Sequence, residues 1–223
     1  IGNERGVAGE TCWSTIDPAA IPYPGYDAPD VGEHLQRGDA DGSVWRPGET
    51  DVSIRPGWFW HPAENERVRD VTNLLDLYAT SVGRNSKLLL NVPPTRDGLL
   101  HDADTASLLA FRSRREAIYG RDLAAGARRR GDARSQTLDL PEPVRFDTTA
   151  LAEDIRHGQH VASYAIEAEV EGRWREIVRG TTIGYKKIDR FAPVTATRVR
   201  VTITNALAEP RLLHTGLFDS LTF

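Results

Sequence analysis

Acidic and aromatic side chains are concentrated near the start of the chain. Four of its five tryptophans lie within the first 60 residues. A tryptophan ring can stack on the C–H face of a pyranose, while carboxylates bind hydroxyls or move protons. The pattern favours a sugar site, and tryptophans packed into loops are the alternative explanation. The candidate side chains are Glu4, Glu10, Glu49, Asp51, Arg55, Trp58 and His61.

Other common chemistries lack their motifs. The histidines have no metal-ligand spacing, and His157 and His160, three residues apart, are more typical of a polar turn. A single cysteine, Cys12, excludes an intrachain disulfide and a cysteine-based zinc site. There is no nucleophile elbow and no Walker loop. We therefore expect no metal site.

Charge and hydropathy limit the classes of partner that the sequence predicts. With 28 Lys and Arg against 32 Asp and Glu, the net charge of −4 gives no support for nucleic acid as a partner. The arginine run at 128–130 has no interleaved aromatic residues and predicts a solvated face. No run approaches the roughly 18 apolar residues of a membrane span, so we expect a soluble protein without a membrane partner.

Periodicity predicts an α/β arrangement in the first half. Residues 65–82 have apolar positions at helical spacing, and 104–119 predict a second helix. Residues 87–92 form a nearly continuous apolar run, typical of a strand covered on both faces, and 51–55 alternate as a short strand. One buried parallel strand cannot close a sheet, so the missing partners must come from upstream sequence or from another chain.

Residues after about 143 predict a second, all-β unit. Segments 161–170, 174–179, 186–191 and 197–204 alternate with period two, and Gly172 lies where a hairpin turn would fall. Residues 126–143, rich in Gly, Pro and Arg, predict a linker. The expected ranges are thus 1–125 for the α/β part, 126–143 for the linker and 144–223 for an antiparallel β-sandwich.

Cell location cannot be deduced from the first residues. They contain neither the charged nor the apolar region of a signal peptide. The sequence has no methionine, which predicts a processed product or a fragment. A secreted or periplasmic location is slightly favoured over a cytoplasmic one.

Several segments carry a resemblance to a known enzyme family. Residues 1–8 and 10–14 read I-G-N-E-R-G-V-A and E-T-C-W-S, and residues 45–61 read W-R-P-G-E-T-D-V-S-I-R-P-G-W-F-W-H. They resemble the G-N-E, E-T-x-W-S and D-V-S-I-R-P-G-W-F blocks of the 1,3/1,4-specific subgroup of the family 29 α-L-fucosidases. Residues 88–94 with 97–99 resemble the last barrel strand and loop of these enzymes, and 153–159 and 181–186 resemble their C-terminal domain.

The resemblance implies a fold and a reaction. The expected fold class is α/β plus all-β, the C-terminal part of a (β/α) TIM-like barrel followed by an antiparallel β-sandwich. The implied activity is retaining exo-hydrolysis of α-1,3/1,4-linked fucose from glycans, by double displacement between two carboxylates. No cofactor is implied, because the carboxylates carry the chemistry, and the expected partner is a fucosylated oligosaccharide or glycoconjugate.

Site residues follow from the matched motifs. The Glu of G-N-E falls on Glu4, which the resemblance makes the general acid/base, with Glu49 as the alternative. Trp58 is the candidate for stacking on the sugar, and Arg55, His61 and Trp13 are weaker substrate-binding candidates. The family's nucleophilic aspartate precedes G-N-E, so the nucleophile would be supplied by an N-terminal barrel half in the same polypeptide or a second chain.

A non-catalytic function is the alternative. The chain would then be a carbohydrate-binding or structural fragment that acts through its β-sandwich. Sugar binding of that kind needs exposed aromatic rings on loops, and Trp174 and Tyr185 are the candidates.

Overall fold

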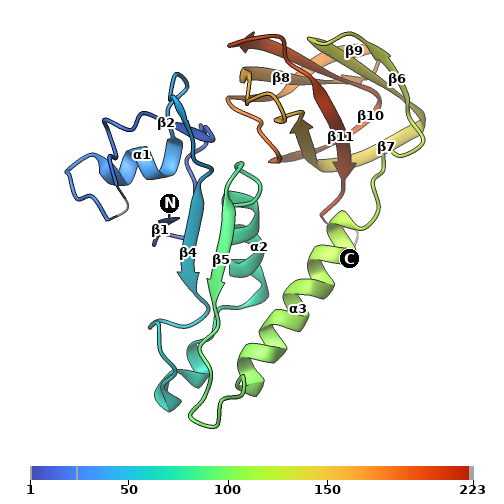
Figure 1. The fold of residues 1–223 in the computed structure, drawn as a ribbon. Coiled ribbons are helices and arrows are strands. Elements are labelled where there is room, and N and C mark those ends of the chain that lie inside the picture. The colour runs from blue at the N-terminus through green and yellow to red at the C-terminus, as the bar shows by residue number, and fades with distance from the viewer. Residues whose placement is uncertain (1, 24, 221–223) are drawn as a thin grey trace.

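The computed structural model describes residues 2–23 and 25–220 and consists of an α/β part followed by an all-β part (Figure 1). This order confirms the expected fold class. Ile1 and residues 221–223, the outer limits of the predicted ranges, lie outside the described residues, as does residue 24.

A short parallel sheet forms the centre of the α/β part. Strands β1 (Gly2–Asn3), β4 (Glu49–Ser53) and β5 (Lys87–Asn91) pair in the order β1-β4-β5. The expected strand at 51–55 therefore starts two residues earlier and ends before Arg55. Among the described residues, the outer edges of β1 and β5 have no further strand beside them.

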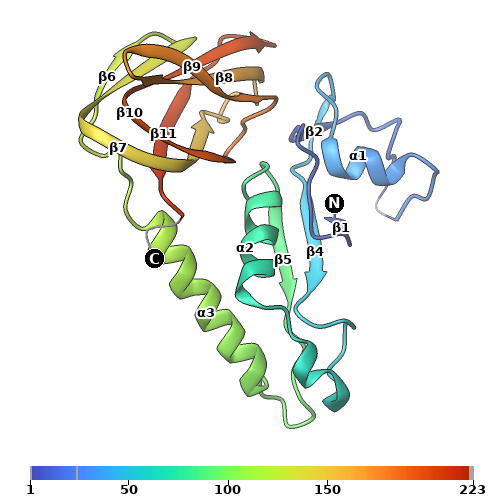
Figure 2. The same cartoon turned by 180° about the vertical axis from the view of Figure 1, so that it is seen from behind.

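Two α-helices cover one face of this sheet (Figure 2). Helix α2 (Val71–Thr80) inserts Leu74 and Leu77 against Val52 and Ile54, and α3 (Asp102–Tyr119) lies beside it. Helix α2 is shorter than the predicted helix at 65–82, because Asp70 has an extended backbone and caps α2 by accepting a hydrogen bond from Asn73 N. The first residues of the predicted range belong instead to the 3₁₀ helix η1 (Pro62–Arg67).

The chain between β1 and β4 is mostly loop, as its proline and glycine content predicts. It contains a two-residue antiparallel pair, β2 (Thr15–Ile16) and β3 (Val44–Trp45), and the short helix α1 (Val31–Arg37). Two tryptophans of this stretch differ in exposure, since Trp13 is buried whereas Trp45 is exposed.

Six antiparallel strands make the all-β part. They pair in the order β11-β7-β10-β8-β9, with β6 beside β7. The hairpin between β8 and β9 turns at Glu171 and Gly172, which both have positive φ, as a type I′ turn requires. The strands are β6 (Arg128–Gly131), β7 (Ser135–Glu153), β8 (Val161–Val170), β9 (Arg173–Gly180), β10 (Lys187–Ala206) and β11 (Leu212–Phe218).

The two longest strands bend, so that each contributes to two layers. Residues 187–190 of β10 pair with 148–151 of β7, and residues 198–202 pair with 135–139, with register shifts between them. The buried core, which includes Phe146, Tyr164 and Val199, lies inside this curved sheet. The segments expected as separate strands at 186–191 and 197–204 are thus the two halves of β10.

The predicted linker at 126–143 is wrong. Residues 128–131 form β6 and residues 135–143 are the first half of β7. Pro141 and Pro143 lie where the pairing of β7 with β10 is interrupted, a position that tolerates the missing proline N–H. Prolines that indicate a linker in sequence are in fact at the corner of a strand.

A buried hydrogen-bond cluster joins the two parts. Asn85, with a left-handed φ of 62°, donates from Nδ2 to the Cys12 carbonyl, Ser14 Oγ and Gln159 Oε1, each at 3.0 Å. Gln159 Nε2 also donates to the Cys12 carbonyl at 2.9 Å. In Figure 1 the arrows of β4 and β5 point away from β7–β11, so this junction is at the opposite end from the carboxyl ends of the parallel strands.

Candidate active site

A groove of about 640 Å³ opens at the carboxyl ends of the parallel strands. Glu4 follows β1, Asp51 is on β4, and Asn91 ends β5. In parallel α/β folds, ligands bind at this edge because the loops after successive strands converge there. The remaining lining residues are Trp58, Phe59, Leu89, Leu90 and Val92.

Two carboxylates line this groove. Glu4 is exposed, and Asp51 is half-buried. Burial raises the pKa of Asp51, and the negative charges of Glu49 and Glu4 raise it further. Asp51 Oδ1 is buried without a hydrogen-bond partner among the described residues. The groove thus combines an accessible carboxylate with one whose proton is held more tightly, which is the equipment for acid/base chemistry.

Hydrogen bonds to the backbone around Trp58 fix the position of this residue. Asn91 Nδ2 donates to the Trp58 carbonyl and to Ser53 Oγ, both at 3.0 Å, and Ser53 Oγ donates to the Gly57 carbonyl at 2.7 Å. Trp58 as a whole remains 43 % exposed. The ends of β4 and β5 therefore fix the loop at 54–58 and leave an aromatic face available to a ligand.

Arg55 is not a substrate ligand in this structure, contrary to the prediction. Its side chain and that of Asp104 are both 0 % exposed. Arg55 Nε and Nη2 donate to the Asp104 carboxylate at 2.9–3.1 Å, and Nη1 donates to Asn65 Oδ1 at 3.1 Å. A guanidinium without exposed surface must be paired, and this pair ties the end of β4 to the first turn of α3.

The other predicted residues lie away from the groove. Trp13 is 7 % exposed at the junction with the all-β part, so burial rules out its expected contact with substrate. Glu49 starts β4 at the opposite end of the strand and forms an ion pair with Lys87 at 3.2 Å. His61 is exposed before η1 and does not line the groove.

Two further residues line the groove: Asp51, a sequence candidate without a specific role, and Asn91, which was not a candidate. Both lie inside matched segments of the sequence, but pattern alone does not say which side of a strand faces the groove. Burial shows which side each residue takes. Thr50 and Val52 are buried, Val52 against the helices, and side chains alternate along a strand, so Asp51 is directed to the other face of β4.

The aromatic residues suggested for binding through the all-β part are already engaged. The guanidinium carbons of Arg198 and Arg200 lie 5.3 Å and 4.5 Å from the Trp174 ring centroid. Tyr185 donates its hydroxyl to the Ser86 carbonyl at 2.6 Å in the junction. Both side chains thus have partners within the chain, which does not favour binding through the all-β part, although Tyr185 remains 39 % exposed.

Within residues 2–23 and 25–220, no group of three or more His, Cys, Asp or Glu side chains is arranged to hold a metal ion. In the same part of the chain no helix is long and apolar enough to cross a membrane.

Known proteins resemble this chain in sequence and in structure. The profile of the α-L-fucosidase family matches residues 26–112. Alpha-L-fucosidase 1 of Arabidopsis thaliana is 34 % identical in an alignment that covers 98 % of this chain and 49 % of the plant protein. A glycoside hydrolase 29 family member from an unknown rumen bacterium is 36 % identical, with a TM-score of 0.89 over 99 % of this chain and 40 % of that chain.

Over nearly its whole length the chain is thus similar to α-L-fucosidases and to structures of glycoside hydrolase family 29. A Ruminococcus gnavus member of family 29, solved in complex with fucose, is 26 % identical, with a TM-score of 0.83 over 100 % of this chain and 50 % of that chain. The chain spans about half the length of the curated relatives it matches. Its fold is that of the fucosidase structures, a partial barrel followed by a β-sandwich.

Proposed function

We propose that this chain is the C-terminal half of a retaining exo-α-L-fucosidase. The observation that carries the proposal is the groove at the carboxyl ends of β1, β4 and β5, where Glu4 and Asp51 lie beside the exposed Trp58. A ring face and carboxylates at one barrel edge suit the recognition and cleavage of a glycoside. The substrate would be a fucosylated oligosaccharide or glycoconjugate.

In this proposal Glu4 is the general acid/base. It would protonate the leaving glycosidic oxygen in the first step and then deprotonate the water that attacks the fucosyl-enzyme. Exposure at the groove supports this role, because the acid must reach the bond that breaks. Glu49 becomes the weaker candidate, since it begins β4 and is paired with Lys87.

The nucleophile would come from a barrel half that precedes these residues. In the part of the chain that the structure describes, the three-stranded sheet has open edges at β1 and β5, and a barrel needs more strands to close. Leu89 of β5 is 49 % exposed and Leu109 of α3 is 60 % exposed. This exposed apolar surface is consistent with a further element of the barrel packing against it. An upstream half in the same polypeptide is the simplest source, and a second chain is the alternative.

Linkage specificity is a finer part of the proposal. Residues 45–61, with the D-V-S-I-R-P-G-W-F segment, resemble the 1,3/1,4-specific subgroup. We therefore expect α-1,3- and α-1,4-linked fucose to be the preferred substrate.

The role of Glu4 is tested by leaving-group dependence in the full-length polypeptide. Glu4→Gln should slow hydrolysis of a fucosyl oligosaccharide by about 10²–10⁴-fold, the usual contribution of a general acid. An activated aryl fucoside, whose leaving group needs no proton, should lose far less in the fucosylation step, measured as a burst of released phenol. Glu49→Gln is the matched control and should affect both substrates alike. Equal losses for Glu4→Gln on the two substrates would reject the assignment.

A further inference from the structure

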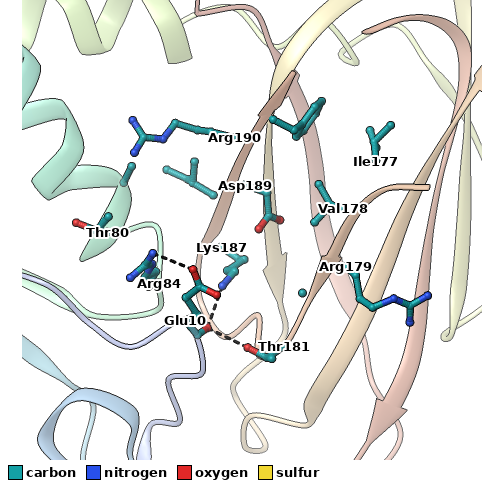
Figure 3. Close-up of a pocket in the computed structure, with 14 residues that line it drawn as sticks. Glu10, Thr80, Arg84, Ile177, Val178, Arg179, Thr181, Lys187, Asp189 and Arg190 are labelled. Atoms are coloured by element: carbon teal, nitrogen blue, oxygen red, sulfur yellow. Dashed lines mark hydrogen bonds and ion pairs between the residues drawn. The ribbon is translucent and has the colours of Figure 1, made fainter. Parts of the chain in front are cut away.

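A second groove lies between the two parts of the chain, at the end opposite to the candidate active site. Its volume is about 440 Å³, within the range of roughly 300–1,000 Å³ for small-molecule sites. Figure 3 shows that Arg84 and Glu10 reach it from the α/β part, whereas Lys187 and Asp189 come from β10. Ile177 and Val178 of β9 form an apolar wall.

Lys187 is the unusual member of this groove. The residue is only 5 % exposed, and its Nζ donates one hydrogen bond, to the Glu10 carbonyl at 2.9 Å. Among the described residues no carboxylate oxygen lies within 4.0 Å of this Nζ. A buried ammonium normally has a charged partner and uses all three of its donors, so Lys187 retains unused hydrogen-bonding capacity.

Asp189 supplies the complementary acceptor. It is two residues further along β10, hence on the same face of the strand. Its Oδ2 accepts from the Tyr164 hydroxyl at 2.6 Å, and no described residue donates to Oδ1. Burial raises the pKa of Asp189 and lowers that of Lys187, which means that both groups are poorly hydrated.

A ligand that enters here must accept from one group and donate to the other. An anion would suit Lys187 but would be repelled by Asp189, and a cation would meet the reverse problem. A hydroxyl group both accepts and donates, and an apolar wall suits the C–H face of a sugar ring. The other basic residues of the lining, Arg84, Arg179 and Arg190, each form an ion pair with a carboxylate. The two groups that remain, Lys187 and Asp189, therefore favour a neutral, hydroxyl-rich ligand.

We propose that the groove between the two parts binds a neutral saccharide ring, with Lys187 donating to one hydroxyl and Asp189 accepting from another. The site is separate from the groove at Glu4, because it lies where α2 ends rather than where β4 and β5 end. The proposed binding goes beyond the proposed function, and only its kcat control rests on that function. Such a site would hold a second sugar without cleaving it.

The test is saccharide binding to the full-length polypeptide. L-Fucose and D-galactose are titrated by calorimetry, and crystals are soaked with the same sugars. Lys187→Met and Asp189→Asn should each raise the Kd of one site by at least about tenfold, the loss expected for a hydrogen bond to a charged group. Trp58→Ala should leave this site intact, and soaked crystals should show a sugar between Lys187 and Asp189.

Controls separate this site from folding and from catalysis. Lys186→Met is the matched variant, because Lys186 is directed to Tyr78 and lies outside the groove, so Kd should not change. Lys187→Met should leave the kcat for aryl fucoside hydrolysis unchanged. If Lys187→Met fails to fold, Asp189→Asn alone decides, since its amide oxygen can still accept from Tyr164. An empty groove in soaked crystals, a Kd unaffected by Asp189→Asn, or binding of sulfate in place of sugar would overturn the proposal.

Discussion

The buried pair of Arg55 and Asp104 gives a stability prediction that can be worked from the structure. Both side chains are 0 % exposed, and Asp104 accepts from two nitrogens of the guanidinium. Asp104→Asn keeps the shape but leaves the positive charge of Arg55 buried without neutralisation. Removing one member of a buried pair costs about 3–5 kcal/mol. We expect Asp104→Asn to lower the free energy of unfolding by that amount.

The assay is urea denaturation of the full-length polypeptide, followed by tryptophan fluorescence. Trp60 is a suitable local reporter, because its ring lies 6.4 Å from that of His101, at the start of α3. Arg112→Ala is the matched control on the same helix. It breaks an exposed pair with Glu116 and should change stability by only about 0.3–0.5 kcal/mol.

A double-mutant cycle completes the test. Arg55→Met combined with Asp104→Asn removes the orphaned charge, so the double variant should be less destabilised than the sum of the two single variants. Additive losses, or a loss for Asp104→Asn no larger than that for Arg112→Ala, would refute the account of Arg55 as a buried structural residue.

Three further predictions concern the junction and the β-sandwich. Burial raises the pKa of the Cys12 thiol to about 11, so native protein at pH 8 should resist alkylation that urea-unfolded protein undergoes; equal labelling rates in both would contradict this burial. Asn85→Gly, which tolerates the left-handed φ, should still cost about 1–3 kcal/mol in urea denaturation, because buried acceptors lose their donor; an unchanged midpoint would show that the cluster contributes nothing. Arg156 holds the pKa of Asp154 well below its usual range, so the stability that this pair contributes above the unfolded-state pKa should be lost as pH falls below about 4. In a plot of unfolding free energy against pH, Asp154→Asn should reduce this loss at acid pH. An unchanged loss would exclude the pair as its source.

The elements with strong periodicity were predictable from sequence. The strand at 87–91, the helix at 102–119 and the hairpin around Gly172 appear where the pattern indicates. Their signals are local, since an apolar run, a helical repeat and a turn glycine each act within a few residues. The bend of β7 was missed because Pro141 and Pro143 indicate an interruption without saying whether the chain continues in the sheet.

The candidate site was only partly predictable. Motif resemblance picked out Glu4 and Trp58, which do line one groove. Arg55 and Trp13 belong to equally polar or aromatic segments, yet Arg55 is paired with Asp104 inside the fold, and Trp13 is 7 % exposed between residues whose backbones bond to the all-β part. Those contacts join residues far apart in the chain, so no local pattern reports them. The role of Asn91 in holding the Trp58 loop depends on tertiary packing in the same way.

The most direct test of the central claim is release of L-fucose from an α-1,3/1,4-fucosylated oligosaccharide. The full-length polypeptide and the 223-residue chain alone are assayed side by side by chromatography of the free sugar. We predict that the full-length polypeptide releases fucose and that the 223-residue chain does not, because it contains only part of the barrel. No release by the full-length polypeptide, or equal release by the 223-residue chain, would contradict the account.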